Sequence, residues 1–345
     1  MLQQLDHLPE GLLETPAPGL EALLGGPTLI HLPGQRRAPL FVSVLLHGNE
    51  TVGWEAVRAL LAARLTRYGA LRLPRALSLF IGNVAAAAHG VRRLPGQPDY
   101  NRVWPGAAPD HGPEQLMMAQ VVETMRARAP FASVDLHNNT GRNPHYGCVN
   151  VLEPRTLQLA SLFARTLVYF TSPTGVQSQA FTGICPAVTL ECGKVGEQGG
   201  VDHAREFVGA LLQLTELPAR LPAAREFDLF ETVARARIPP GVHFGFPPEQ
   251  ADLVLDPALE RLNFCELPAG MAFGRVRPGK GLCVEVHDAE GRDLSAQFFR
   301  ISGEELLLRR PAMPSMLTRN EVVIRQDCLC YLMIRREPPL AVRDD

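Results

Sequence analysis

The chain has 345 residues, with 34 Lys and Arg against 36 Asp and Glu and a formal net charge of −2 at pH 7. This balance provides no basic excess of the kind that binds nucleic acids or anionic membrane surfaces. With 46% hydrophobic and 20% charged residues, the composition excludes a disordered chain, and the length suggests about two globular domains.

The N-terminus and the cysteines bear on where the protein resides. No apolar run approaches the ~20 residues that a membrane-spanning helix needs. The first residues, MLQQLDHLPEGLLE, contain acidic side chains and lack the positive region and apolar stretch of a secretory signal. The seven cysteines are scattered and include no C-x-x-C pair, which favours reduced thiols. We therefore expect a cytoplasmic protein that contacts neither membrane nor nucleic acid, with any metal bound by His and carboxylate groups.

The first 200 residues alternate apolar runs with helical patterns. Near-continuous Val, Ile, Leu and Phe runs predict buried strands at 39–46, 76–81, 132–136, 147–152 and 187–190. Apolar residues at helical spacing predict helices over 52–65 and 113–127. Strands that alternate with helices indicate an α/β domain.

Two further segments stand apart from this alternation. The stretch 92–112 is rich in Gly, Pro, Asp and Asn, and so long a loop within a compact domain is usually functional or disordered. After about residue 219, short apolar runs alternate with turn signals, at 227–238, 262–267, 272–277, 282–288, 297–301, 321–325 and 328–335. We predict a catalytic domain over 1–218 and a smaller β-rich domain over 219–345.

Histidines and glutamates follow three of the predicted strands. His47 and Glu50 come directly after the first strand, and His137 and Glu191 end two later ones. In open α/β sheets, ligands bind outside the carboxyl ends of the strands. Two imidazoles and a carboxylate form a His₂Glu set, a known catalytic zinc ligation that leaves a position open for water. The remaining carboxylate, Glu191, is then the candidate general base.

Each of these residues also has an ordinary interpretation when taken alone. An isolated H-x-x-E is most often a surface His beside a helical Glu. Asp135 and His137 could form a buried hydrogen-bonded pair, and Glu191 could pair with Lys194. The long loop adds Arg92, Arg93 and Arg102, whose guanidinium groups suit an anionic substrate, although a solvated basic loop has the same composition.

The motifs HGNE, DYNRVWPG, DLHNNTG and TLECGK, in this order, resemble the succinylglutamate desuccinylase/aspartoacylase family, a branch of the zinc carboxypeptidase-like fold. The resemblance spans about residues 40–200 and continues weakly into LNFCELPAGMAFGRV. It implies a mixed central sheet flanked by helices. The C-terminal β-rich domain would then cap the mouth of the active site.

The resemblance also implies roles for individual residues. His47, Glu50 and His137 match the ligands of one zinc ion per chain, and Glu191 matches the general base. Arg92 matches the residue that polarises the scissile carbonyl. The other positions implied are Asn101 and Arg102 for the substrate carboxylate and Asp99 as a hydrogen-bond partner of the first histidine.

Three departures from the family pattern concern the substrate. Gly82-Asn83-Val84 stands where the family has Gly-Asn-Pro, and the loop before Asn101 is longer, so that Arg93 could replace Arg92. The residues after His137, from Asn138 to Tyr146, differ from those of typical desuccinylases, and we expect this stretch to line the pocket. The substrate therefore need be neither succinylglutamate nor acetylaspartate.

The leading hypothesis is a zinc-dependent deacylase that cleaves the amide bond of an N-acyl amino acid or a similar small molecule bearing a carboxylate. A zinc carboxypeptidase acting on peptide C-termini, or an inactive homologue that only binds a small molecule, are the alternatives. The sequence leaves homo-oligomerisation open.

Overall fold

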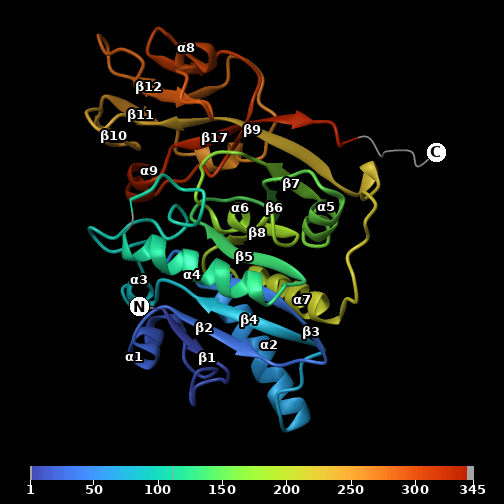
Figure 1. Ribbon diagram of the computed structural model, residues 1–345. Helices are drawn as coiled ribbons and strands as arrows, with labels where there is room; N and C mark the ends of the chain where they lie inside the picture. The colour runs from blue at the N-terminus through green and yellow to red at the C-terminus, as the bar shows by residue number, and fades with distance from the viewer. Residues whose placement is uncertain (1, 111, 340–345) are drawn as a thin grey trace, which may run out of the picture.

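The computed structural model describes residues 2–110 and 112–339 of the chain. A twelve-stranded mixed sheet runs through the molecule with helices on both faces, and a second sheet of five strands lies beyond it (Figure 1). This confirms the predicted α/β class with a β-rich C-terminal part. None of the described helices is long and apolar enough to cross a membrane.

The N-terminal part contributes the helix-covered region of the large sheet, in which β3 pairs in parallel with β4 and β5, and β5 in parallel with β8. The carboxyl ends of β3, β5 and β8 therefore meet at one edge. The strands here are β1 (Gln3–Leu5), β2 (Thr28–Leu32), β3 (Arg36–Val44), β4 (Arg75–Ile81), β5 (Ala132–Asn139), β6 (Tyr146–Val149), β7 (Thr166–Tyr169) and β8 (Ala187–Lys194).

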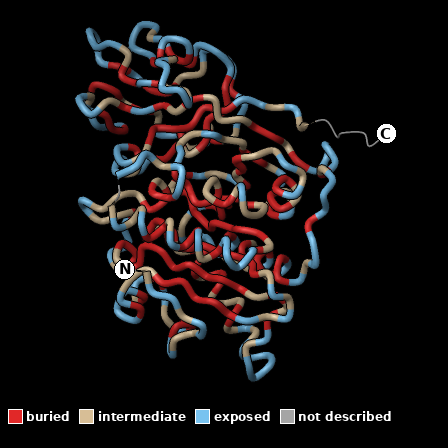
Figure 2. Tube along the Cα trace, in the orientation of Figure 1, coloured by how far each residue is buried: buried red, intermediate tan, exposed pale blue. Residues whose placement is uncertain are grey.

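Side chains of β3 alternate between two apolar layers. Leu40, Val42 and Val44 pack in one core with residues of α2 and α7, whereas Phe41 packs in another with α4 and α6. This alternation follows from the two-residue period of a strand and buries both faces of the sheet (Figure 2). The helices are α1 (Leu20–Leu24), α2 (Val52–Tyr68), α3 (Val84–Ala88), α4 (Pro113–Ala127), α5 (Pro154–Ser161), α6 (Gln177–Phe181) and α7 (Gln198–Gln213).

The C-terminal part has its own apolar core but shares the large sheet. β9 pairs in parallel with β7 and antiparallel with β17, so the sheet continues past residue 218, and a domain boundary there stays a prediction. The elements are β9 (Asp228–Arg237), β10 (Phe244–Gly245), β11 (Leu253–Leu255), β12 (Ala272–Val276), β13 (Glu285–His287), α8 (Ser295–Phe298), β14 (Phe299–Ser302), β15 (Glu305–Leu308), β16 (Met313–Ser315), α9 (Glu321–Gln326) and β17 (Cys330–Arg336). Short 3₁₀ turns occur at Ala17–Gly19, Ala224–Glu226 and Leu259–Leu262.

Two of the predicted C-terminal strands are wrong. Residues 321–325 form helix α9, because the Asn320 side chain caps the helix by accepting a hydrogen bond from the Val323 amide at 3.2 Å. The run 262–267 ends a 3₁₀ turn and contributes a single bridge between Leu267 and Ala312. In both segments the apolar and β-branched residues predict a strand, but local capping and turn formation determine the observed structure.

Candidate metal centre and its cavity

A tight turn after β3 delivers His47 and Glu50. Gly48 is required in this turn, since a Cβ there would lie 2.2 Å from the backbone nitrogen of Ala87 on α3. The Gly48 amide donates to the carbonyl oxygen of Arg92 at 3.1 Å. The turn and the long loop after α3 are therefore held together by the backbone.

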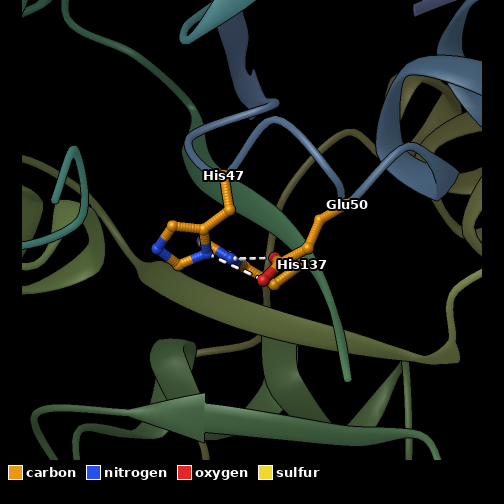
Figure 3. A group of neighbouring side chains, drawn as sticks. All are labelled: His47, Glu50 and His137. Carbon is orange, nitrogen blue, oxygen red and sulfur yellow. Dashed lines mark hydrogen bonds and ion pairs between the residues drawn. The ribbon is translucent and has the colours of Figure 1, made fainter. Parts of the chain in front are cut away.

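The side chains of His47, Glu50 and His137 converge on one point (Figure 3). The Nδ1 atom of His47 lies 2.8 Å from one carboxylate oxygen of Glu50, and the Nδ1 atom of His137 lies 2.7 Å from the other. The candidate ligand atoms all lie within 4.8 Å of one another, and all three residues are buried. The predicted ligand set thus comes together from a turn and a neighbouring strand.

The outer ring nitrogens of both histidines contact carboxylates. His47 Nε2 lies 2.9 Å from Asp99, and His137 Nε2 lies 2.7 Å from Asp135, which also accepts a hydrogen bond from Ser43 at 2.6 Å. Such partners fix the orientation of metal-ligating imidazoles. Asp99 thus lies where the sequence placed it, and Asp135 plays the same part for the second histidine.

The electrostatics of this cluster favour a cation. Burial alone would lower the pKa of His137, but Asp135 and Glu50 outweigh it and hold that pKa well above the usual value. Burial opposes ionisation of Glu50, yet His47 and His137 hold its pKa far below the ordinary range. Two inward-facing imidazole nitrogens with one ionised carboxylate match the donor set of His₂Glu zinc sites.

Glu191 lies directly beside the cluster. Glu191 lies opposite His137 in the register between β5 and β8, and it is buried. Its carboxylate accepts a hydrogen bond from the side-chain amide nitrogen of Asn139 at 2.9 Å. Burial raises the pKa of Glu191 to about 7, with Glu50 adding to the rise and the histidines opposing it. A carboxylate with such a pKa can accept and return a proton near neutrality.

Two adjacent arginines of the long loop lie differently: Arg92 lies in the cluster, and Arg93 lies outside the cavity. Arg92 is buried, lines the cavity, and lies 3.0 Å from Asp99 and 3.5 Å from Glu50. Arg93 instead donates to the carbonyl of Gln97 at 3.0 Å and is not among the residues that line the cavity. The geometry therefore favours Arg92 for any contact with a ligand.

Asn101 and Arg102 also line the cavity, but Asn138 does not. The Asn101 side-chain oxygen accepts a hydrogen bond from the Gln177 amide at 3.0 Å, and Arg102 donates to the Asn101 carbonyl at 2.7 Å. The Asn138 side chain accepts from the Val52 amide at the start of α2 and donates to Gly193. The Asn138 side chain thus joins α2 to β8, and the substrate contact expected from the sequence stays a prediction.

The opposite wall of the cavity comes largely from segments that sequence reasoning did not single out. Asp327 and Tyr331 reach it from the C-terminal part, and no motif marks either one. From the 138–146 stretch Tyr146 does line the cavity, whereas His145 stacks on His203 with ring centroids 4.7 Å apart. The remaining lining residues are Cys148, Val168, Phe170, Ser172, Pro173, Val176, Thr189, Thr232, Ser315 and Met316.

Comparisons with known proteins identify the family and the fold of the chain. A family model described as the succinylglutamate desuccinylase/aspartoacylase catalytic domain matches residues 39–215, just over half of the chain. Murine aminoacylase 3 superposes with a TM-score of 0.58 at 17% identity, covering 90% of this chain and 99% of that one. Succinylglutamate desuccinylase from Chromobacterium violaceum gives 0.56 at 20% identity, with 82% and 88% covered. No curated protein matched in the sequence comparison.

The chain has a mixed α/β sheet that brings a His-x-x-Glu turn and a strand histidine to one edge, and it shares its fold with murine aminoacylase 3. Among proteins of this fold, the chain belongs to the succinylglutamate desuccinylase/aspartoacylase family. Members of this family are hydrolases that act on amide bonds.

Proposed function

We propose that the protein is a zinc-dependent deacylase that hydrolyses the amide bond of an N-acyl amino acid or a similar small amide bearing a carboxylate. The observation that carries the proposal is the arrangement of the side chains around one cavity. His47, Glu50 and His137 converge there, and Glu191 lies beside His137 in the strand register.

The residues present fit zinc, and His47, Glu50 and His137 would hold one ion per chain. Zinc would supply Lewis acidity, which polarises a carbonyl and makes water a better nucleophile near neutral pH. Asp99 and Asp135 hold the two rings in the orientation that this ligation needs.

The chain's own groups then account for proton transfer and charge stabilisation. Glu191 accepts the proton of the attacking water and returns it to the leaving nitrogen, for which its raised pKa suits it. The Arg92 guanidinium is held by Asp99 and Glu50 and stabilises negative charge that develops on the amide oxygen.

The substrate carboxylate is assigned to the neighbouring pair Asn101 and Arg102. The Arg102 side chain is about a quarter exposed, so its guanidinium can accept a new partner at the mouth of the cavity. Arg forks bind carboxylates bidentately. Residues from the C-terminal part close the other wall, which favours a small molecule over a long peptide.

The seven cysteines are all free thiols, and this supports the proposal that the protein works in the reducing environment of the cytoplasm.

The test is amine release from N-acyl amino acids and from short peptides with free C-termini, measured in zinc-loaded protein and after chelation. Chelator-sensitive hydrolysis of the small amides, restored by zinc, is expected, with Glu191→Gln as the inactive matched control. Trimming of the peptides instead would favour a carboxypeptidase, and no hydrolysis in zinc-loaded protein would contradict the proposal.

A further inference from the structure

An aspartate from the C-terminal part lies between the two cavity arginines. Asp327 follows α9, its amide donates to Val323 at 2.9 Å, and its carbonyl accepts from Arg237 at 3.2 Å. Just after it, the Leu329 amide bonds to Ala236 on β9 at 2.9 Å. The Asp327 side chain is 9% exposed and is therefore fixed in the cavity wall by its surroundings.

The two oxygens of Asp327 face different guanidinium groups. One lies 3.5 Å from Arg92 and the other 3.6 Å from Arg102. Among the described residues that line the cavity, these two arginines are the side chains with permanent positive charge. Arg92 is in addition contacted by Asp99 and Glu50 and is assigned to the amide oxygen, so the guanidinium of Arg102 is the one left for a substrate carboxylate.

Apart from His47, Glu50 and His137, which would hold the metal ion, the rest of the described wall has no cation for a second anionic group. This remaining wall is made of uncharged side chains such as Val168, Phe170 and Met316, together with the carboxyl group of Glu191. A second carboxylate on the substrate would lose its hydration, find no partner and face Asp327 at short range. Repulsion of this kind is one of the ways in which a site discriminates against a wrong ligand.

We propose that Asp327 is a specificity-determining residue that restricts the cavity to substrates with one carboxylate and an otherwise uncharged acyl group and side chain. The inference rests on the proposed function and narrows its substrate class. It predicts that acylated derivatives of neutral amino acids are preferred over those of aspartate and glutamate.

The test compares N-acetylleucine with N-acetylglutamate in zinc-loaded wild type, Asp327→Asn and Asp327→Glu. The wild type should favour N-acetylleucine by about tenfold or more in kcat/KM, since one uncompensated like-charge contact is worth at least that much. Asp327→Asn should lower the ratio of kcat/KM for N-acetylleucine to kcat/KM for N-acetylglutamate by about tenfold, chiefly through a lower KM for N-acetylglutamate. Asp327→Glu keeps the negative charge and should leave this ratio unchanged.

Asp228→Asn is the matched control, because Asp228 also bridges two arginines, Arg165 and Arg335, but lies outside the cavity. This variant should leave the substrate ratio unchanged. A wild type that prefers the dicarboxylate overturns the inference whether or not Asp327→Asn folds. An unchanged ratio in folded Asp327→Asn overturns it equally.

Calorimetric titration of both compounds into zinc-loaded Glu191→Gln and into Glu191→Gln/Asp327→Asn separates this inference from the proposed function. A gain in affinity for N-acetylglutamate in the double variant, with no hydrolysis by the wild type, would support the role of Asp327 while the deacylase proposal fails. Equal affinity ratios in the two proteins, or no binding of either compound, would overturn the role of Asp327.

Discussion

The two walls of the cavity are built differently. At the carboxyl edge of the sheet, both nitrogens of His47 and of His137 have carboxylate partners at 2.7–2.9 Å, as in the contacts of His47 with Asp99 and of His137 with Asp135. On the C-terminal wall, Asp327 faces Arg92 and Arg102 across 3.5 and 3.6 Å, distances of ion pairs and not of tight hydrogen bonds. The first wall is rigidly specified, and the second can exchange partners with a ligand.

This difference suggests a division of roles, with catalysis at the sheet edge and substrate selection at the C-terminal wall. Ligation and proton transfer need groups held in one geometry, which neighbouring parallel strands and their hydrogen-bonded partners provide. Selection needs only complementary charge and shape at the mouth of the cavity, which the C-terminal segments can supply. Changes at the sheet edge should therefore abolish turnover, whereas changes on the C-terminal wall should alter which substrate is used.

The largest effect is expected from His137→Ala. The change removes one proposed ligand, leaves Asp135 without its imidazole partner and leaves Glu50 with His47 alone. Metal content measured by elemental analysis should fall to background, and hydrolysis should vanish with it. His89, an exposed histidine at the end of α3, provides the control, and His89→Ala should retain both metal and activity. Full metal content in His137→Ala would refute the assignment of this ligand.

Glu191→Gln should keep the metal and lose most turnover. The amide preserves the shape of the side chain and its position beside His137 but cannot accept the proton of water. A loss of about 10²–10⁴-fold in kcat is expected. The measurement is hydrolysis at saturating substrate in protein of verified metal content, and wild-type turnover in this variant would exclude Glu191 as the base.

A pair of adjacent arginines provides the next contrast. Arg92→Gln should lower kcat by about 10²-fold. It should also destabilise the protein by roughly 3 kcal/mol or more, because buried carboxylates lose their guanidinium partner. Arg93→Gln should leave activity and stability close to wild type, since Arg93 contacts the Gln97 carbonyl outside the cavity. Kinetics with thermal unfolding would show the contrast, and the reverse pattern would place Arg93 on the substrate.

The rate should rise with pH through the ionisation of Glu191. Only the carboxylate form can accept a proton, so activity is lost as the pH falls below its pKa. Burial raises the pKa of Glu191 from 4.5 to about 7. A bound cation would favour the carboxylate form and so lower this pKa part of the way towards 4.5. A profile of kcat/KM against pH should therefore inflect between 4.5 and about 7, and a flat profile across this interval would contradict the assignment.

The smallest effect belongs to the C-terminal wall. Tyr331 lines the cavity from β17. Tyr331→Phe should change KM by about threefold and leave kcat nearly unaltered, in keeping with uniform binding of substrate and transition state. Steady-state kinetics distinguish kcat from KM. A fall in kcat as large as that of Glu191→Gln would mean that Tyr331 takes part in catalysis, contrary to this prediction.

Most of the sheet edge could be predicted from the sequence, because each functional group there follows a near-continuous apolar strand. His47, Glu50 and His137 were found in this way, and so was helix α4, whose bounds match the predicted 113–127. Parallel strands bring their carboxyl ends to one edge, so position along the chain already implies proximity in space.

The C-terminal wall could not be predicted in the same manner. Asp327 falls between two of the apolar runs of the β-rich region, 321–325 and 328–335. The helix α9 just before it depends on a side-chain cap that composition does not reveal. The approach of Asp327 to Arg92 depends on the pairing of β17 with β9, a contact between segments about 100 residues apart. The contacts of the Asn138 side chain with Val52 and Gly193 are likewise tertiary contacts that the sequence does not reveal.

The central claim is that His47, Glu50 and His137 bind a single zinc ion, and anomalous diffraction at the zinc edge from crystals of zinc-loaded protein tests it most directly. We predict one strong peak per chain between the Nδ1 atoms of the two histidines and the Glu50 carboxylate, absent in crystals of His137→Ala. A peak elsewhere, or none at this cluster in fully loaded protein, would contradict the metal centre on which the proposed function depends.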